Sequence, residues 1–418
     1  MRRVDRIALI LLVFAPLALA VDEPRPKDWP GWRGAARTGV SSEKGLLKTW
    51  PKEGPKLLWT CAGLGEGYST PSVAGDKLFV MGSLKGEEFV HAIDLRDGKI
   101  LWSRKIGKVG ENIGPPYPGP RSTPTIDAGR LYTLGSDGDL VCLECGSGKV
   151  VWARHLVKEF EGNRGPWAYT ESPLVDGDAI LCTPGGPKAA MLKLDKKTGK
   201  VIWQMPLEEA HVAGYSSLVV AEVGKRRLYV QFMGAALVGV DAATGKFQWK
   251  YRKNVGGVNA MTPIVHDGCV FTSAAGNTGA GGDALLRLTA TEAGVTAKQV
   301  YLLANMKNFH GGVVRIGGEL YGTGSVGLVC LDFVTGEMKW KHRSIGQGSL
   351  MAADGHLYLR NTSGQVALVE AGADRYVEKG RFTQAQRTEF PVFAHPVVVG
   401  GRLYLRDADL LFCHDMAR

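Results

Sequence analysis

The sequence predicts an all-β protein, an eight-bladed β-propeller of four-stranded antiparallel blades that an N-terminal strand closes. Three observations support this fold. A turn motif that ends in Trp, seen as DLRDGKILW at 94–102, recurs with its last residue at Trp152, Trp203, Trp249 and Trp340. A Gly followed by a short alternating apolar strand also recurs along the chain. The 56 Gly and 20 Pro are spread throughout, as expected of a turn-rich repeat protein.

Each repeat is interpreted as four strands in order. The first follows a polar residue and often a Pro, as in STPSV at 69–73. The second follows the recurring Gly, which is found at 75, 129, 177, 224, 268, 318, 355 and 401. The third ends at the acidic residue of the turn motif, and the fourth contains the Trp. In this turn the Asp accepts backbone hydrogen bonds, the Gly supplies a positive φ, and the Trp packs against the neighbouring blade.

The last repeat and an early strand together predict how the ring closes. The last repeat supplies strands at 391–399, 401–406 and 409–414 but no Trp, whereas PKLLW at 55–59 is a Trp strand with no repeat before it. Pairing that strand into the last blade would remove the exposed sheet edges. We therefore expect a strap segment at 21–54, across the outside or bottom, and a single propeller domain at 55–418.

Residues 1–20 have the pattern of a secretory signal peptide. Three Arg precede the apolar run at 7–19, which ends in Ala-Leu-Ala. The run is short for a membrane span and contains Pro16, and no later stretch is long enough to be one. We therefore expect a mature chain that is periplasmic or secreted, without a transmembrane segment.

The distribution of charge argues against a nucleic-acid-binding protein, and the positions of the cysteines argue against a disulfide or a metal site. The net charge of +10 comes from basic residues scattered over the repeats, which favours a solvated surface over a nucleic-acid interface. Cys142, Cys330 and Cys413 each lie two residues before the acidic residue of a turn motif, so they share one slot in separate repeats. Cys142 and Cys145 have opposite parity on a strand, so we expect neither a disulfide nor a metal between them.

The pattern A-x-D-x-x-T-G-x-x-x-W is similar to the tryptophan-docking repeat of the pyrroloquinoline-quinone (PQQ)-like propeller family. The copy at 92–102 has Asp97 in place of the Thr. The segment DWPGWRGAARTGVSSEKGL at 28–46 also resembles the lead-in of bacterial members of this family. The resemblance covers nearly the whole chain after the signal segment. It implies one of two classes: quinoprotein dehydrogenases, which hold PQQ and calcium over the propeller axis, or BamB-like members, which bind proteins without a cofactor.

Residues just before each first strand are expected to ring the mouth of the central channel, where a ligand would lie. With the loop residue Trp167, the candidates are Tyr68, Arg121, Trp167, Tyr169, Glu171, Tyr215, Asn259, His310, Gln347 and His395. These side chains either bind a ligand or only form hydrogen bonds at the ends of the strands. Two insertions, at 107–121 and 158–169, join consecutive blades and should stand side by side at the mouth. They form either a ledge for a peptide or sugar or a cover for blade edges.

The remaining choice is between a binding protein and an enzyme. By resemblance to the dehydrogenases, Glu171 and Asn259 are weak calcium candidates. However, the chain has no adjacent Cys pair, and NMKNFHGG at 305–312 offers no carboxylate as base or third ligand. We therefore favour a non-catalytic, exported propeller, expected to be a monomer, that binds a protein or polysaccharide at the channel mouth without cofactor, metal or nucleic acid. The alternative is a PQQ- and calcium-dependent dehydrogenase of an alcohol or sugar.

Overall fold

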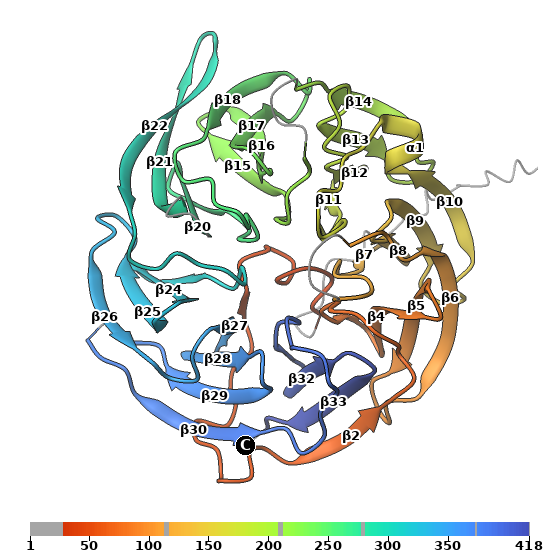
Figure 1. The fold of residues 1–418 in the computed structure, drawn as a ribbon, viewed down its shortest axis with the longest axis vertical. Helices are drawn as coiled ribbons and strands as arrows, with labels where there is room; N and C mark the ends of the chain where they lie inside the picture. The colour runs from red at the N-terminus through yellow and green to blue at the C-terminus, as the bar shows by residue number, and fades with distance from the viewer. Residues whose placement is uncertain (1–27, 113–116, 208–211, 277–280, 373, 418) are drawn as a thin grey trace, which may run out of the picture.

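The strands form eight sheets arranged as blades of a ring around a central axis (Figure 1). The structure is a computed structural model that describes residues 28–112, 117–207, 212–276, 281–372 and 374–417. The predicted signal peptide at 1–20 lies outside the described residues. Seven sheets have four strands and one has five. The predicted eight-bladed, all-β propeller is therefore confirmed.

The first four blades follow the chain in order from the axis to the rim. Blade 1 contains β3 (Ser72–Ala74), β4 (Lys77–Leu84), β5 (Glu87–Asp94) and β6 (Ile100–Lys108). Blade 2 contains β7 (Thr125–Asp127), β8 (Arg130–Leu134), β9 (Asp139–Glu144) and β10 (Val150–His155). Blade 3 contains β11 (Leu174–Asp176), β12 (Ala179–Cys182), β13 (Met191–Asp195) and β14 (Val201–Met205). Blade 4 contains β15 (Val219–Val223), β16 (Arg226–Phe232), β17 (Leu237–Asp241) and β18 (Phe247–Tyr251).

The other four blades complete the ring, and a short helix, α1 (Leu156–Phe160), follows blade 2. Blade 5 contains β19 (Ile264–His266), β20 (Cys269–Ala275), β21 (Gly281–Thr291) and β22 (Gly294–Leu303). Blade 6 contains β23 (Val314–Ile316), β24 (Glu319–Gly324), β25 (Gly327–Asp332) and β26 (Met338–His342). Blade 7 contains β27 (Gly348–Ala353), β28 (His356–Asn361), β29 (Gln365–Glu370) and β30 (Glu378–Thr383). Blade 8 contains β31 (Val397–Val399), β32 (Arg402–Asp407) and β33 (Leu410–Asp415), joined by β2 (Leu57–Cys61).

The turn motif docks each blade onto the next, as the contact between blades 2 and 3 illustrates. Asp195 Oδ1 accepts hydrogen bonds from the backbone N and the Oγ1 of Thr198, at 2.8 and 2.7 Å. Gly199 has a φ of +68°, and a Cβ there would lie 2.8 Å from the indole of Trp152. The same indole donates from Nε1 to Lys196 O at 3.0 Å. The Gly is therefore required both for the turn and for the close approach of the Trp.

The predicted closing strand is confirmed. Strand β2 pairs antiparallel with β33, and this places Trp59 opposite Cys413. Cys142 and Cys330 lie opposite Trp152 and Trp340 in their own blades, so the three cysteines share one slot. All seven cysteines are free thiols.

Residues 28–54 form a strap that crosses the middle of the ring (Figure 1, red to orange). Its Asp28 accepts a hydrogen bond from Gly75 N, in the turn between β3 and β4, at 3.0 Å. Its Glu43 accepts from the backbone N of Gly400 and Gly401, between β31 and β32. These turns lie at the ends of the innermost strands that are remote from the blade connections. The strap therefore covers the end of the ring opposite the channel mouth. Its short strand β1 (Val40–Ser41) pairs parallel with β27.

Two buried arginines fasten the strap to several blades. Arg33 donates to Val313 O, before β23, and Arg37 donates to Leu218 O at 2.9 Å and to Ser172 O at 3.0 Å. Burial lowers the pKa of Arg37 to about 10, so the side chain stays charged at neutral pH. The strap thus links blades 3, 4 and 6 close to the axis.

Candidate functional site

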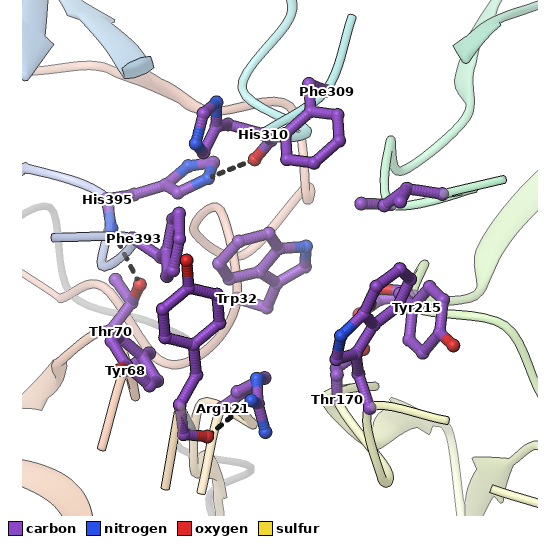
Figure 2. A pocket seen from close by; sticks show the side chains of 15 residues that line it. Trp32, Tyr68, Thr70, Arg121, Thr170, Tyr215, Phe309, His310, Phe393 and His395 are labelled. Atoms are coloured by element: carbon purple, nitrogen blue, oxygen red, sulfur yellow. Dashed lines mark hydrogen bonds between the residues drawn. The ribbon is translucent and has the colours of Figure 1, made fainter. Parts of the chain in front are cut away.

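An aromatic cavity of about 300 Å³ opens among the segments that precede the innermost strands. Its lining residues come from the strap and from most of the blade connections: Trp32, Tyr68, Thr70, Tyr117, Arg121, Trp167, Thr170, Tyr215, Ser217, Val258, Ala260, Phe309, His310, Phe393 and His395. Figure 2 shows the labelled side chains converging on a common space from separate segments. The cavity therefore lies at the channel mouth, where the sequence predicts the ligand.

The floor of the cavity is built by Trp32 of the strap. Its indole Nε1 donates to Thr262 Oγ1 at 2.8 Å, and its ring centroid lies 4.6 Å from that of His395. The His395 backbone N donates to Thr70 Oγ1 at 3.0 Å, and its ring Nε2 lies 3.1 Å from His310 O. The floor is therefore fixed by hydrogen bonds at both of its aromatic rings.

One wall is a cluster of four aromatic rings. Phe393 lies 5.2 Å from the Tyr68 ring centroid and 5.3 Å from that of Tyr117, and the His310 ring stacks on it at 5.3 Å. The guanidinium of Arg121 lies 5.5 Å from the centre of the Tyr68 ring, within the range of a cation–π contact. This wall therefore combines a flat apolar surface with one positive charge.

The facing wall comes from the second insertion and the connection before β15. Trp167 and Tyr215 pack edge to face with ring centroids 5.2 Å apart. Thr170 Oγ1 donates to Tyr215 O at 2.8 Å. Tyr117 and Arg121 come from the first insertion and Trp167 comes from the second, so both predicted insertions contribute to the cavity. Figure 2 labels Arg121 of the first insertion and Thr170, which directly follows the second.

Arg121 supplies the only formal charge among the described lining residues at neutral pH. It donates to Tyr117 O at 2.6 Å and to Gly119 O at 3.4 Å, and no carboxylate of the described residues forms an ion pair with it. Burial lowers the pKa of Arg121, but a guanidinium starts above 12 and remains charged. Burial also lowers the pKa of His310 to about 4 and that of His395 to about 3, so both rings are neutral.

Three buried polar atoms of the lining have no hydrogen-bond partner within the described part of the chain. They are Tyr68 Oη and both ring nitrogens of His310. Tyr68 as a whole is only 5% exposed, and burial raises the pKa of its hydroxyl. Buried polar groups in folded proteins are nearly always paired, so these three atoms mark a place where hydrogen bonds are left to a ligand or to water.

Six of the ten predicted site residues line the cavity: Tyr68, Arg121, Trp167, Tyr215, His310 and His395. The other four, Tyr169, Glu171, Asn259 and Gln347, do not. Tyr169 is buried and donates to Pro184 O at 2.7 Å, which supports the backbone behind the site. The position just before an innermost strand therefore identifies segments that border the cavity, whereas the direction of each side chain depends on its neighbours. Ligand binding by these residues stays a prediction.

The two weak calcium candidates do not fit a calcium site. Glu171 accepts from the backbone N and the Oγ1 of Thr183 at 2.7 and 3.0 Å. Asn259 donates to Met233 O at 2.9 Å and accepts from Gly256 N at 3.0 Å. Burial also raises the pKa of Glu171 to about 8, so the carboxyl is mostly protonated at neutral pH. Hard cations need ionised or free oxygen ligands, and these oxygens are already used by the protein.

A second group of potential metal ligands is an ion-pair cluster. Asp137, Asp139 and His155 bring ligand atoms within 4.8 Å of one another. However, Arg164 binds Asp137 at 2.8 Å, and Lys108 lies 3.6 Å from the same carboxylate. These two cations already neutralise Asp137 and oppose the approach of a metal ion.

Sequence reasoning missed the aromatic residues Trp32, Phe309 and Phe393. Phe309 and Phe393 stand next to or two residues before predicted site residues, and the aromatic side chains in these connections were an available signal. Trp32 had no such signal, because the repeats do not specify the path of the strap.

Comparison with known proteins places the chain near two groups of propellers. A sequence model of the family described as outer membrane protein assembly factor BamB matches residues 86–342. The outer membrane protein assembly factor BamB of Yersinia pestis is 33% identical over 63 residues, which are 15% of this chain and only 13% of that protein.

Solved structures of both groups share the fold. BamB from Moraxella catarrhalis has a TM-score of 0.58 at 16% identity, covering 87% of this chain and 100% of that one. Quinohemoprotein alcohol dehydrogenase from Comamonas testosteroni has a TM-score of 0.62 at 15% identity, covering 93% and 80%. At these identities the structural likeness shows the fold alone.

Proposed function

Since the chain belongs to the family of outer membrane protein assembly factor BamB, we propose that it binds a protein or polymeric ligand without catalysing a reaction. The binding face is the channel mouth. The observation that supports this most directly is the aromatic cavity, to which both insertions contribute and which the strap closes from below. Aromatic and Arg side chains dominate the affinity of protein interfaces, and here they are gathered at one opening.

The proposal places the protein outside the cytoplasm, in the periplasm or secreted. Residues 1–20 have the composition of a signal peptide, and we assign 21–54 to the strap and 55–418 to the propeller domain. Within the described ranges no helix is long and apolar enough to cross a bilayer. The name of the family refers to assembly at the outer membrane, which is consistent with an exported chain.

The second candidate function is a PQQ- and calcium-dependent dehydrogenase of an alcohol or sugar. The fold likeness to an alcohol dehydrogenase favours it, together with the position of the cavity at the channel mouth. The residues argue against it, because Glu171 and Asn259 do not fit a calcium site and no carboxylate lines the cavity among the described residues.

One pair of variants tests the binding face. Arg121→Ala and Trp167→Ala should each weaken binding of the natural partner by roughly 1 to 4 kcal/mol, with little change in stability. The partner is cross-linked to the purified chain in an envelope extract, identified, and then titrated by calorimetry. Arg226→Ala is the matched control, since Arg226 is a surface residue of β16 that donates to Thr291 O and Glu292 O. Unchanged binding by both mouth variants would place the interface elsewhere.

A separate assay tests the enzyme alternative. The purified chain is mixed with PQQ and calcium, and absorbance and dye-linked oxidation of alcohols and sugars are recorded. We expect neither a cofactor spectrum nor turnover. Turnover that requires both additions would establish the dehydrogenase instead.

A further inference from the structure

We propose that the cavity at the channel mouth is a specific site for a compact monocarboxylate carried on an aromatic ring. This inference rests on the proposed use of the mouth as a binding face and names the chemistry recognised there. The carboxylate pairs with Arg121, and the ring lies between Trp32 and the facing aromatic walls. Two kinds of molecule carry a carboxylate close to an aromatic ring: a free aromatic acid and a polypeptide whose C-terminal residue is aromatic.

The size and lining of the cavity determine the body of the ligand. Its volume of about 300 Å³ is at the small end of the range for small-molecule sites, so it takes one ring with its substituents and excludes a folded surface. The floor ring of Trp32 and the pair Trp167 and Tyr215 are flat and largely apolar. Aromatic groups pack on such surfaces through stacked or edge-to-face contacts.

The charge of the cavity determines the charge of the ligand. Arg121 is partly buried and points two of its groups at backbone carbonyls. The buried Glu88 carboxyl attracts it from a distance, but no described carboxylate forms a close ion pair with it. A desolvated charge without a close counter-ion is unfavourable, and a ligand carboxylate in contact with the guanidinium offsets that cost. The planar guanidinium matches a carboxylate in geometry as well as in charge.

The same arrangement excludes polyanions. His310 and His395 face the cavity as neutral rings, and no other cationic side chain lines it in the described part of the chain. A second or third negative charge would therefore be buried without a partner. The single positive charge of Arg121 therefore neutralises one carboxylate of the ligand and leaves a second one without a partner.

The unpartnered polar atoms supply the remaining contacts. Tyr68 lies under Arg121, and its hydroxyl can donate to the same anion. The neutral ring of His310 has one donor and one acceptor free, which suit a polar substituent such as the amide of a peptide bond. These groups give the site a means to select among aromatic acids.

Two matched pairs of probes test the proposal by calorimetric titration of the full chain. The first pair is 3-phenylpropanoate and 3-phenylpropanamide, and the second is a five-residue peptide that ends in Phe with a free or an amidated C-terminus. Each acid should bind at least about tenfold more tightly than its amide, because a charge-assisted hydrogen bond contributes more than a neutral one. The tighter acid identifies the source, free acid or chain terminus.

Variants connect the binding to the cavity. Arg121→Gln should reduce the affinity for each acid to that of its amide, whereas Arg226→Gln should bind as the parent does. Tyr68→Phe removes only an unpartnered hydroxyl, so the variant should have the melting temperature of the parent and bind the acids several-fold more weakly. This variant therefore tests the proposal even if Arg121→Gln does not fold stably. Equal binding of acid and amide, absence of acid binding at millimolar concentration, or full binding by both variants would overturn the proposal.

The outcome is separable from that of the proposed function. If no acid binds but capture of the protein partner still depends on Trp167, only the present inference fails. If the acids bind through Arg121 while partner capture ignores Arg121 and Trp167, the proposed binding face fails and the cavity stands as a small-molecule site.

Discussion

The indole rings of Trp152 and Trp203 occupy equivalent positions in consecutive blades but differ in one hydrogen bond. Trp152 Nε1 donates to Lys196 O at 3.0 Å, whereas the buried Nε1 of Trp203 has no partner in the described structure. Both rings lie over the Gly of the next turn, where a Cβ on Gly245 would come within 2.6 Å of Trp203. The shape of the contact is therefore repeated, while its hydrogen bond is not.

This difference gives a paired prediction. Trp203→Ala should lower the free energy of unfolding by roughly 3 kcal/mol, since a large ring is removed from a packed contact. Trp152→Phe should cost about 1 kcal/mol more than Trp203→Phe, because only the former loses a hydrogen bond. Chemical denaturation measures all three. Equal costs for the two Phe variants would show that the Lys196 hydrogen bond contributes nothing, and loss of ligand affinity by folded Trp203→Ala would contradict its purely structural role.

Buried Glu171 makes stability depend on pH in an unusual direction. Burial is the largest cause of its raised pKa of about 8, and the Thr183 hydrogen bonds and the charge of Arg37 oppose it. In the unfolded chain the group titrates near pH 4.3, so between the two values the native state binds the extra proton. Stability should therefore fall as pH rises from about 4.3 to 8 and level off above that.

The variant Glu171→Gln isolates this effect. It keeps the shape of the side chain and does not titrate, so its melting temperature should fall less than that of the parent between pH 5 and 8. Above pH 8 it should melt at a higher temperature than the parent does. Parallel pH profiles of the two proteins would show that Glu171 is ionised in the native state.

At the scale of single elements, the turns and strands were predictable and the strap was not. The turn at 195–199 is defined by local contacts, in which Asp195, Thr198 and Gly199 each have a role that their residue type already implies. The path of the strap depends on contacts with distant segments, such as Arg33 with Val313 and Arg37 with Leu218. No local pattern encodes those partners, and the floor of the cavity was missed with them.

The residues of the candidate site likewise fall into those that the sequence predicted correctly as lining the cavity and those whose side chains point elsewhere. Arg121 and His395 were found because they precede innermost strands, a position that repeat counting gives directly. Glu171 holds an equivalent position, but its carboxyl turns to Thr183 and Gln231 and leaves the mouth. Side-chain direction at these positions depends on packing between blades, which the sequence of one repeat does not contain.

At the scale of the whole molecule, the ring is held by one non-covalent closure. Strand β2 supplies the outer strand of blade 8, and Trp59 packs over the turn at Gly98 in blade 1 and donates to Leu95 O at 3.1 Å. The same five residues therefore complete one blade and dock it onto the next. A propeller without this closure would expose the edge of β33 and the face of blade 1 together.

Deletion of residues 55–60 should consequently open the ring. The unpaired edge of β33 is a template for pairing with another chain, so we expect a large fall in melting temperature and aggregation that increases with protein concentration. Calorimetry and light scattering measure the two effects. A synthetic peptide of residues 54–62 should restore the melting temperature in a concentration-dependent way, because binding to the native state alone stabilises it by mass action. An unchanged melting curve after the deletion would show that the strap, through Arg33 and Arg37, holds the blades together without the closing strand.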